Sequence, residues 1–237
     1  MTALQFRSDV TVDLVKHNAK DFDVAMAARV STIGGSHDET VDLTRDHGLI
    51  NFLMRDRHGS PFEHNSFTFY IEAPIFVARE FFRHRAGWSY NEQSGRYKEL
   101  DPVFYVPPRD RDLIQVGRPG AYTFEPGTYD HFGITRWEHE QTYRITWTSY
   151  QRMLREGIAK EVARNVLPVG IFTSFYATCN ARSLMHFLSL RTMREGSKFP
   201  SFPQREIELV AEDMEGIFEE RMPITHAAFL RNGRVAP

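Results

Sequence analysis

The sequence contains little cysteine and no long apolar run, and these shortages exclude several classes of protein. Its single cysteine, Cys179, excludes an internal disulfide framework and a thiolate zinc site made by one chain. The apolar runs are too short to span a bilayer. The first residues soon turn polar and acidic instead of forming the core of a signal peptide. We therefore expect a cytoplasmic protein.

The sequence also lacks an excess of charge of either sign. Lysine and arginine together number 29 and aspartate and glutamate 31, which gives a net charge of −2. A protein that coats nucleic acid or binds a membrane surface through basic residues needs a sustained excess of lysine and arginine. This balance argues against both classes, so local basic clusters must serve local purposes.

What the sequence does contain is enough apolar material for a sizeable core. The chain has 237 residues, of which 41% are hydrophobic and 13% aromatic, as in ordinary globular proteins. We expect one domain over residues 1–237. Predicted strands and helices alternate without a regular βαβ order, which indicates a mixed α+β fold.

Hydrophobic periodicity predicts the individual elements. Strands are expected at 10–15, 66–72 and 171–179. Helices are expected at 21–30, 48–57, 75–84, 130–156, 160–167, 180–194 and 204–220. Asp21 is positioned to cap the first helix and Pro74 to open the third, and residues 31–37 are expected to form a turn. Prolines and glycines crowd residues 100–129, which predicts a long loop with a short strand at 104–106.

The segment 83–97 (RHRAGWSYNEQSGRY) concentrates polar groups that can anchor an anion. Arginines offer fixed forks of donors that suit phosphate, and Gly95 lets backbone approach a ligand closely. A nucleotide phosphate is the natural ligand. The alternative is a solvated charged loop, but the neighbouring Phe81, Phe82 and Trp88 argue against full solvation.

The predicted helix 180–194 carries a cation on its apolar face. Helical spacing places Arg191 with the apolar Leu184 and Leu188, where it must reach solvent, pair with an acid or meet an anionic ligand. Arg182 and His186 are spaced to share one ligand, or to form a solvated pair. Asn180 is a good N-cap, whatever its function.

Two further patterns suggest other chemistry. His58, Glu63 and His64 lie close together in sequence, but their spacing matches no strong metal motif, and we predict no metal site. Cys179 lies in an apolar run, where an inert core cysteine is favoured over a nucleophile. From the sequence alone, we expect Arg164 to be a surface arginine of a helix.

Together these segments resemble the flavin-dependent thymidylate synthase family. Its signature is Arg-His-Arg, a spacer and then serine, here Arg83, His84, Arg85 and Ser94. Similarity continues through HGSPFEHNSFTFYIEAPIFVAREFFRHR and EVARNVLPVGIFTSFYATCNARSLMHFLSLR, and so covers most of residues 58–100 and 160–191.

The resemblance implies a central, mostly antiparallel sheet flanked by helices, in a homotetramer whose active sites are shared between subunits. It assigns FAD contacts to Ser60, Arg83, His84, Arg85, Glu92, Asn180, Arg182 and His186. It assigns dUMP contacts to Glu80, Arg83, Glu92, Gln93, Ser94, Gly95, Arg96, Arg164 and Arg191. Arg191 matches the arginine that ionises or polarises the uracil ring, and is the expected catalytic residue.

The implied reaction is the reductive methylation of dUMP to dTMP. NADPH reduces FAD, 5,10-methylenetetrahydrofolate supplies the carbon, and tetrahydrofolate is released. Because Arg191 stabilises negative charge on the uracil, no cysteine nucleophile is required. Two other classes remain open: a metal-dependent nucleotide hydrolase using His58, Glu63, His64 and His84, and a nucleotide-binding regulator without catalysis.

The sequence departs from the family pattern at four points. The spacer between Arg85 and Ser94 is one residue longer than is common. His186 stands where asparagine is common, Glu80 where glutamine is common, and Ser60 where threonine is common. A carboxylate at Glu80 repels a phosphate unless a neighbouring cation pairs with it.

Overall fold

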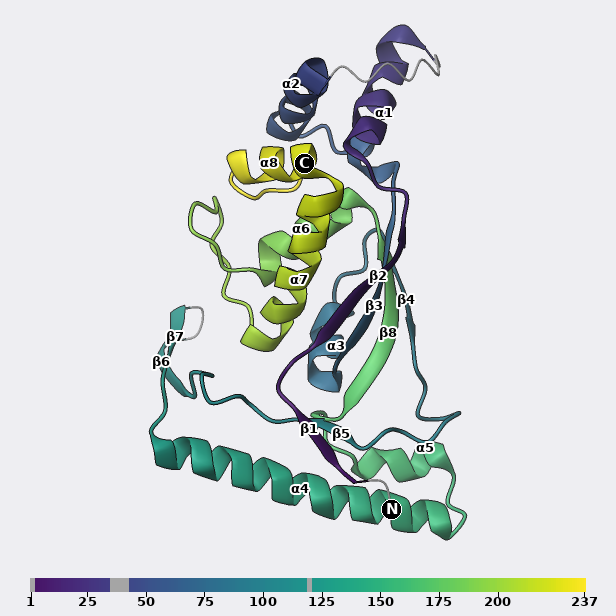
Figure 1. The fold of residues 1–237 in the computed structure, drawn as a ribbon, viewed down its shortest axis with the longest axis vertical. Helices are drawn as coiled ribbons and strands as arrows, with labels where there is room; N and C mark the ends of the chain where they lie inside the picture. Colours follow the sequence, from purple (N-terminus) through teal and green to yellow (C-terminus); the bar gives the residue numbers. More distant parts are fainter. Residues whose placement is uncertain (1–2, 35–42, 119–120) are drawn as a thin grey trace. The chain divides into compact units, whose positions relative to one another are not determined.

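The computed structural model describes residues 3–34, 43–118 and 121–237, which form helices and strands in mixed order (Figure 1). The strands are β1 (Gln5–Arg7), β2 (Thr11–His17), β3 (Phe67–Pro74), β4 (Trp88–Glu92), β5 (Val103–Tyr105), β6 (Ile114–Arg118), β7 (Ala121–Glu125) and β8 (Phe172–Cys179). The helices are α1 (Asp21–Ile33), α2 (Leu43–Arg55), α3 (Ile75–Phe81), α4 (Tyr129–Arg155), α5 (Lys160–Ala163), α6 (Ala181–Arg191), α7 (Arg205–Arg221) and α8 (Pro223–Arg231). Short 3-10 turns occupy η1 (Ser60–Glu63) and η2 (Arg164–Val166).

The largest sheet has four strands in the order β2-β3-β8-β4. β1 pairs in parallel with β5, so that Phe6 faces Phe104, and β6 forms an antiparallel hairpin with β7. A mixed α/β fold with an antiparallel sheet and helices confirms the expected class. Within the described ranges, no helix is long and apolar enough to cross a membrane.

The chain divides into two compact units. The first unit is Met1–Val10, Glu72–Glu80 and Glu92–Phe175, and the second unit is Thr11–Ile71, Phe81–Asn91 and Tyr176–Pro237. Both β3 and β8 contribute residues to each unit. The single domain expected from the sequence stays a prediction, and each unit is described by itself below.

In the first unit, the long helix α4 presents an aromatic face to a small core. Tyr143 stacks on Phe104, with ring centroids 4.6 Å apart, and its hydroxyl donates to the carbonyl of Tyr105 at 2.9 Å. Thr128 caps the start of the helix by accepting from the backbone of His131. Gly157, at a φ of 77°, follows its end as the sequence predicts. These contacts fix the helix against β5.

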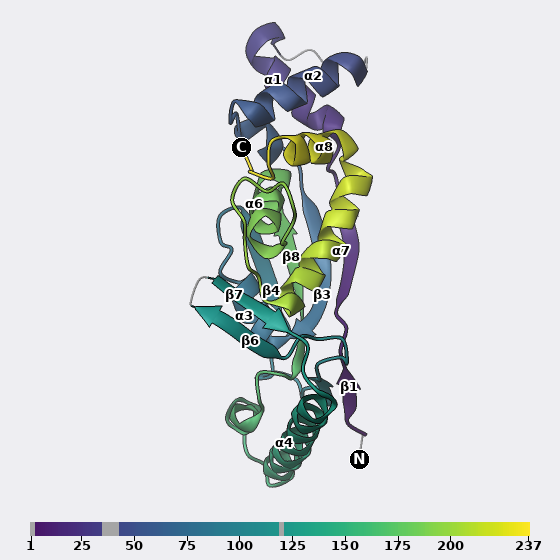
Figure 2. The same cartoon turned by 90° about the vertical axis from the view of Figure 1, so that its left-hand side faces the viewer.

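In the second unit, α6 and α7 cover one face of the sheet (Figures 1 and 2). Their apolar residues pack with those of the strands: Phe67 lies edge-on to Phe218, and Phe81 lies 4.5 Å from Phe187. Cys179, at the end of β8, is only 2% exposed. Helix α6, which follows Asn180 and ends at Arg191, packs on this core.

Several elements differ from the sequence-based expectations. β4 replaces a predicted loop, and the β6-β7 hairpin occupies part of the predicted long loop. α8 was not expected, α1 continues to Ile33 into the expected turn, and Pro74 ends β3 instead of opening α3. The rest of that expected turn, after Gly34, lies outside the described residues. α6 ends at Arg191, earlier than predicted, because the backbone of Thr192 is extended.

The expected cap of α1 by Asp21 is wrong. Asp21 is the first helical residue, and its carboxylate accepts from Ile224 N at 2.9 Å, Thr225 N at 2.8 Å and Thr225 Oγ1 at 2.6 Å. It therefore caps the start of α8, far away in sequence. A carboxylate satisfies the otherwise unpaired N–H groups of any nearby helix end, and tertiary structure decides which one.

Candidate functional site

The predicted site residues fall into two groups, one in each unit. The first unit holds Glu80, Glu92, Gln93, Ser94, Gly95, Arg96 and Arg164. The second unit holds Ser60, Arg83, His84, Arg85, Asn180, Arg182, His186 and Arg191. The two groups are built differently, one around a cavity and the other around the ends of α6.

In the first unit, part of the predicted set lines a cavity of about 330 Å³, which we call the Glu92 cavity. Its predicted members are Glu92, Gln93, Gly95 and Arg164. The other lining residues are Ile75, Leu100, Asn165, Leu167, Ile171 and Thr173. The lining combines apolar side chains with a similar number of polar and charged ones, and converging polar groups of this kind can orient a small ligand.

Glu92 is anchored to β8 by a residue that the sequence analysis missed. Thr173 is 4% exposed, and its hydroxyl donates to Glu92 Oε1 at 2.7 Å. The backbone N–H of the next residue, Gln93, donates to the carbonyl of Ser174 at 2.9 Å. A hydroxyl within the apolar run of residues 171–179 must find a partner when buried, which was the available signal.

Gly95 is buried and packs against protein. A side chain there would place its Cβ 3.2 Å from Leu100 Cδ1 and 3.3 Å from Arg164 Cδ. The absence of a side chain thus allows close packing of the loop on Leu100 and Arg164, and the approach of its backbone to a ligand stays a prediction. Packing against Gly95 fixes the stem of Arg164 beside the cavity.

The residues around Ser94 form a tight turn. The carbonyl of Ser94 accepts from Tyr97 N at 3.0 Å and Lys98 N at 3.1 Å, while its Oγ accepts from Arg96 N at 3.2 Å. Arg96 pairs with Glu161 on α5 at 3.1 Å. Ser94 and Arg96 therefore flank the cavity without lining it, and the exposed guanidinium of Arg96 is held by a second element.

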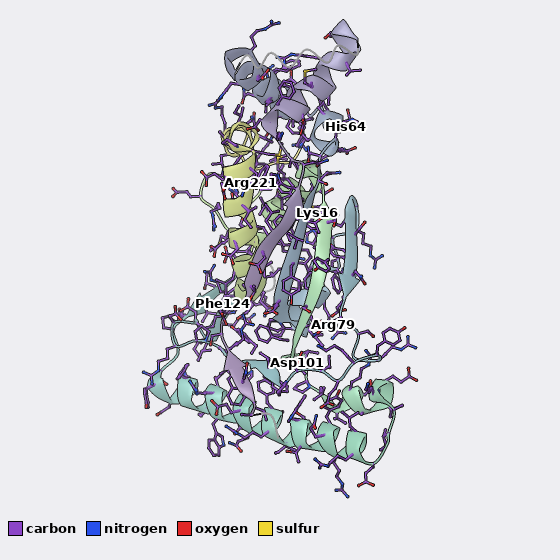
Figure 3. All side chains as sticks on the ribbon, turned by 45° about the vertical axis from the view of Figure 1, so that its right-hand side comes forward. Lys16, His64, Arg79, Asp101, Phe124 and Arg221 are labelled. Carbon is purple, nitrogen blue, oxygen red and sulfur yellow. The ribbon has the colours of Figure 1, made fainter. Side chains whose placement is uncertain are left out.

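Glu80 lies apart from the cavity lining, near the end of α3. It is half-buried, while its neighbour Arg79 is exposed (Figure 3). Its dUMP contact stays a prediction.

In the second unit, the expected catalytic residue is held by a histidine of the signature triplet. Arg191 Nε donates to His84 Nε2 at 3.1 Å, and the His84 ring lies edge-on to Phe187, with centroids 4.9 Å apart. Burial, together with the positive charges of Arg191 and His186, lowers the pKa of His84 to about 4. His84 is therefore neutral at physiological pH and accepts the arginine's hydrogen bond.

The triplet itself is an ordered turn between α3 and β4. The hydroxyl of Tyr90 donates to the carbonyl of His84 at 2.7 Å, and its ring lies edge-on to Phe81. Arg83 and Arg85 are exposed on either side of His84. The alternative of a solvated charged loop holds only for Arg83 and Arg85, whose side chains are exposed, because Tyr90 hydrogen-bonds to the backbone of the triplet.

The start of α6 brings together Asn180, Arg182 and His186. Asn180 caps the helix by accepting from Ser183 N at 2.9 Å, as predicted. Arg182 donates to Glu63 Oε1 at 2.6 Å and to the carbonyl of Pro237 at 2.6 Å. The side chain of His186 is partly accessible, and the buried part of its environment, together with the nearby cations Arg182 and Arg57, lowers its pKa.

Ser60 begins η1, directly after Gly59, whose added Cβ would lie 2.5 Å from Arg182. A side chain at this position would therefore displace the guanidinium of Arg182. Glu63 of η1 forms an ion pair with Arg182, and the ring of His58 stacks on the ring of Phe52. Among the described residues, no cluster of three or more histidine, cysteine, aspartate or glutamate side chains is placed to hold a metal ion.

Cys179 is buried, and burial raises the pKa of its thiol. A buried thiol of raised pKa is a poor nucleophile because the thiolate is the reactive form.

Comparisons with known proteins show which family the chain belongs to. A family model described as "thymidylate synthase complementing protein" matches residues 13–224. A flavin-dependent thymidylate synthase from Streptomyces avermitilis is 65% identical, covering 98% of this chain and 95% of its own. Another, from Streptomyces coelicolor, is 61% identical over 99% of this chain and 96% of its own.

A solved structure shares the fold. The UMP/dUMP methylase PolB from Streptomyces cacaoi, bound with 5-Br dUMP, is 51% identical with a TM-score of 0.94 and covers 99% of this chain and 100% of its own. The relatives are methyltransferases, and this chain is an enzyme of that class. It belongs to the flavin-dependent thymidylate synthase family.

Proposed function

We propose that this enzyme converts dUMP to dTMP by reductive methylation. In this proposal, 5,10-methylenetetrahydrofolate supplies the carbon and leaves as tetrahydrofolate, and NADPH is the reductant. The observation that carries the proposal is the hydrogen bond from Arg191 Nε to His84 Nε2. A hydrogen bond to a neutral ring holds the guanidinium in a defined place, which is what a uracil ring accumulating negative charge requires.

Arg191 supplies the electrostatic part of the mechanism. A fixed cation beside the uracil stabilises negative charge on the ring, so that the ring carbon itself can act as the nucleophile. Pre-organised charges of this kind are among the largest contributions to catalysis. Cys179 takes no part in this scheme because its buried thiol stays protonated.

The Glu92 cavity and its flanks supply the proposed dUMP contacts of the first unit. Arg164 and Arg96 carry forks of donors that match a phosphate, and Gln93 and Glu92 can hydrogen-bond to the sugar or the base. Thr173 fixes Glu92 before substrate arrives, which reduces the ordering that binding requires. The family resemblance also assigns dUMP contacts to Arg83 and Arg191.

The donors of the second unit fit FAD. Arg83 and Arg85 expose two cations, and the start of α6 adds Arg182, His186 and the amide of Asn180. Such a set suits the diphosphate of a dinucleotide, because guanidinium groups and helix N-termini both favour anions. The family resemblance also assigns FAD contacts to Ser60, His84 and Glu92. When bound, FAD supplies the hydride that finishes the methyl group.

An absorbance spectrum and a product assay test this proposal together. We expect purified protein to show flavin bands and to form dTMP when given dUMP, 5,10-methylenetetrahydrofolate and NADPH. A colourless protein that takes up no added FAD would contradict it. The homotetramer, the sites shared between subunits and the cytoplasmic location stay predictions, and size-exclusion chromatography with light scattering tests the first.

We also propose that UMP be assayed as a second substrate. The 50% identical PolB from Streptomyces cacaoi, a UMP/dUMP methylase, was solved with 5-Br UMP, at a TM-score of 0.91 to this chain. Methylation of UMP at a rate near that of dUMP would broaden the function, while the absence of product from UMP would restrict it to the deoxynucleotide.

A further inference from the structure

Arg234, in the segment after α8, is buried and held by several side chains. It is only 6% exposed. Its φ of 56° is a left-handed backbone conformation that residues other than glycine rarely adopt. Its guanidinium lies over the ring of Phe229, 5.1 Å from the centroid. Such a backbone persists only where the surroundings determine it.

A carboxylate on α7 holds the guanidinium of Arg234. Nη1 donates to Glu215 Oε1 at 2.6 Å and Nη2 to Glu215 Oε2 at 2.8 Å, a bidentate pair. His226 Nε2 lies 3.0 Å from the same Oε1. Burial alone would raise the pKa of Glu215, but hydrogen bonds from His226 and Arg234 outweigh it and lower the pKa to about 2. The pair is therefore charged at physiological pH.

Arg234 also reaches the last turn of α6. Nη2 donates to Thr192 Oγ1 at 2.8 Å, and the carbonyl of Arg234 accepts from Ser189 Oγ at 2.8 Å. Thr192 is 2% exposed, and its Oγ1 donates in turn to the carbonyl of Leu188 at 2.7 Å. The end of α6 is thus tied to the segment after α8 at residues 189 and 192.

We infer that Arg234, held by Glu215, is a positioning residue for Arg191. Thr192 directly follows Arg191, so fixing Thr192 fixes the backbone from which the guanidinium reaches His84 at 3.1 Å. Helix ends otherwise fray, and a catalytic cation whose position varies loses most of its effect on the reaction rate. The inference rests on the proposed function, because that function gives Arg191 its chemical role.

The test compares two buried threonines of the second unit. Thr192→Val removes the hydroxyl that accepts from Arg234. Thr225→Val removes a comparable hydroxyl bond, from Thr225 Oγ1 to Asp21, away from the end of α6. Thr192→Ser retains the hydroxyl and is the rescue variant. Arg234→Lys keeps the positive charge but loses the bidentate guanidinium. It takes the place of Thr192→Val in the test if Thr192→Val does not fold.

The first readout is the ¹⁵N resonance of His84 Nε2 in the purified protein without substrates. Arg191→Ala gives its position when the hydrogen bond is absent. We expect Thr192→Val to move the resonance toward that position, and Thr192→Ser and Thr225→Val to leave it at the wild-type value. This readout needs no catalysis, so it decides the positioning role even if wild-type protein forms no dTMP.

The second readout is kcat for dTMP at saturating dUMP. A displacement of about 1 Å can cost up to about 100-fold in rate, so we expect kcat to fall in Thr192→Val and to recover in Thr192→Ser. The inference is overturned if Thr192→Val keeps the wild-type resonance and kcat while its Tm falls like that of Thr225→Val, since Arg234 would then only stabilise the fold. If wild-type protein forms no dTMP, the proposed function is overturned instead.

Discussion

Replacing Thr173 by valine tests how the Glu92 cavity is prepared for its ligand. Thr173 is 4% exposed and donates to Glu92 Oε1 at 2.7 Å, so valine removes one charge-assisted hydrogen bond with little change of shape. Glu92 is itself exposed, and water can replace the lost donor. The side chain of Glu92 then moves freely until the substrate binds.

The size of the effect follows from that freedom. Immobilising a flexible side chain on binding costs about 0.5–1.5 kcal/mol, which corresponds to an affinity about 2- to 13-fold weaker. We expect Thr173→Val to weaken dUMP binding within this range, as measured by isothermal titration calorimetry on flavin-containing protein. Thr173→Ser keeps the hydroxyl and should retain wild-type affinity. An unchanged dissociation constant in Thr173→Val would refute the idea that Thr173 prepares Glu92 for dUMP.

Three further predictions follow. Arg191→Ala should lower kcat by about 100-fold or more, since removing one electrostatic donor costs that much, whereas Cys179→Ala should keep substantial activity; the reverse pattern would contradict the cysteine-free scheme. Asp21→Ala should lower the free energy of unfolding by about 1–2 kcal/mol, through loss of the α8 cap, and urea denaturation showing no change would count against it. The pKa of His84 is lowered to about 4, so the unfolded chain binds more protons below about pH 6.5. Stability should therefore fall as pH decreases from about 6.5 to 4, less steeply in His84→Gln, and an identical slope in that variant would refute the assignment.

The sequence predicts those parts of the fold that local chemistry determines. The stop of α4 at Gly157 and the cap of α6 by Asn180 need only their own neighbours, and both are confirmed. Asp21 shows the limit: it is an equally good cap by composition, but serves α8 because the tertiary fold places that helix beside it. The β6-β7 hairpin escaped prediction because its strands are short and flanked by glycine and proline.

The candidate site, too, could be predicted from the sequence only in part. Arg191 stands out in the sequence because a cation on an apolar helix face needs a partner. That its partner is His84, far away in sequence, is visible only in the structure. For Thr173 the sequence offers only the weak signal of a hydroxyl in an apolar run, and for Arg234 it offers none, since an arginine after a helix is ordinary. Burial with paired partners reveals both residues.

The most direct test of the central claim is the formation of dTMP from dUMP, followed by mass spectrometry. Wild-type protein with FAD, NADPH and 5,10-methylenetetrahydrofolate should convert dUMP to dTMP over many turnovers, and Arg191→Ala, with the same flavin content, should form almost none. If wild-type protein binds flavin and dUMP yet forms no dTMP, or if Arg191→Ala matches the wild-type rate, the account is contradicted.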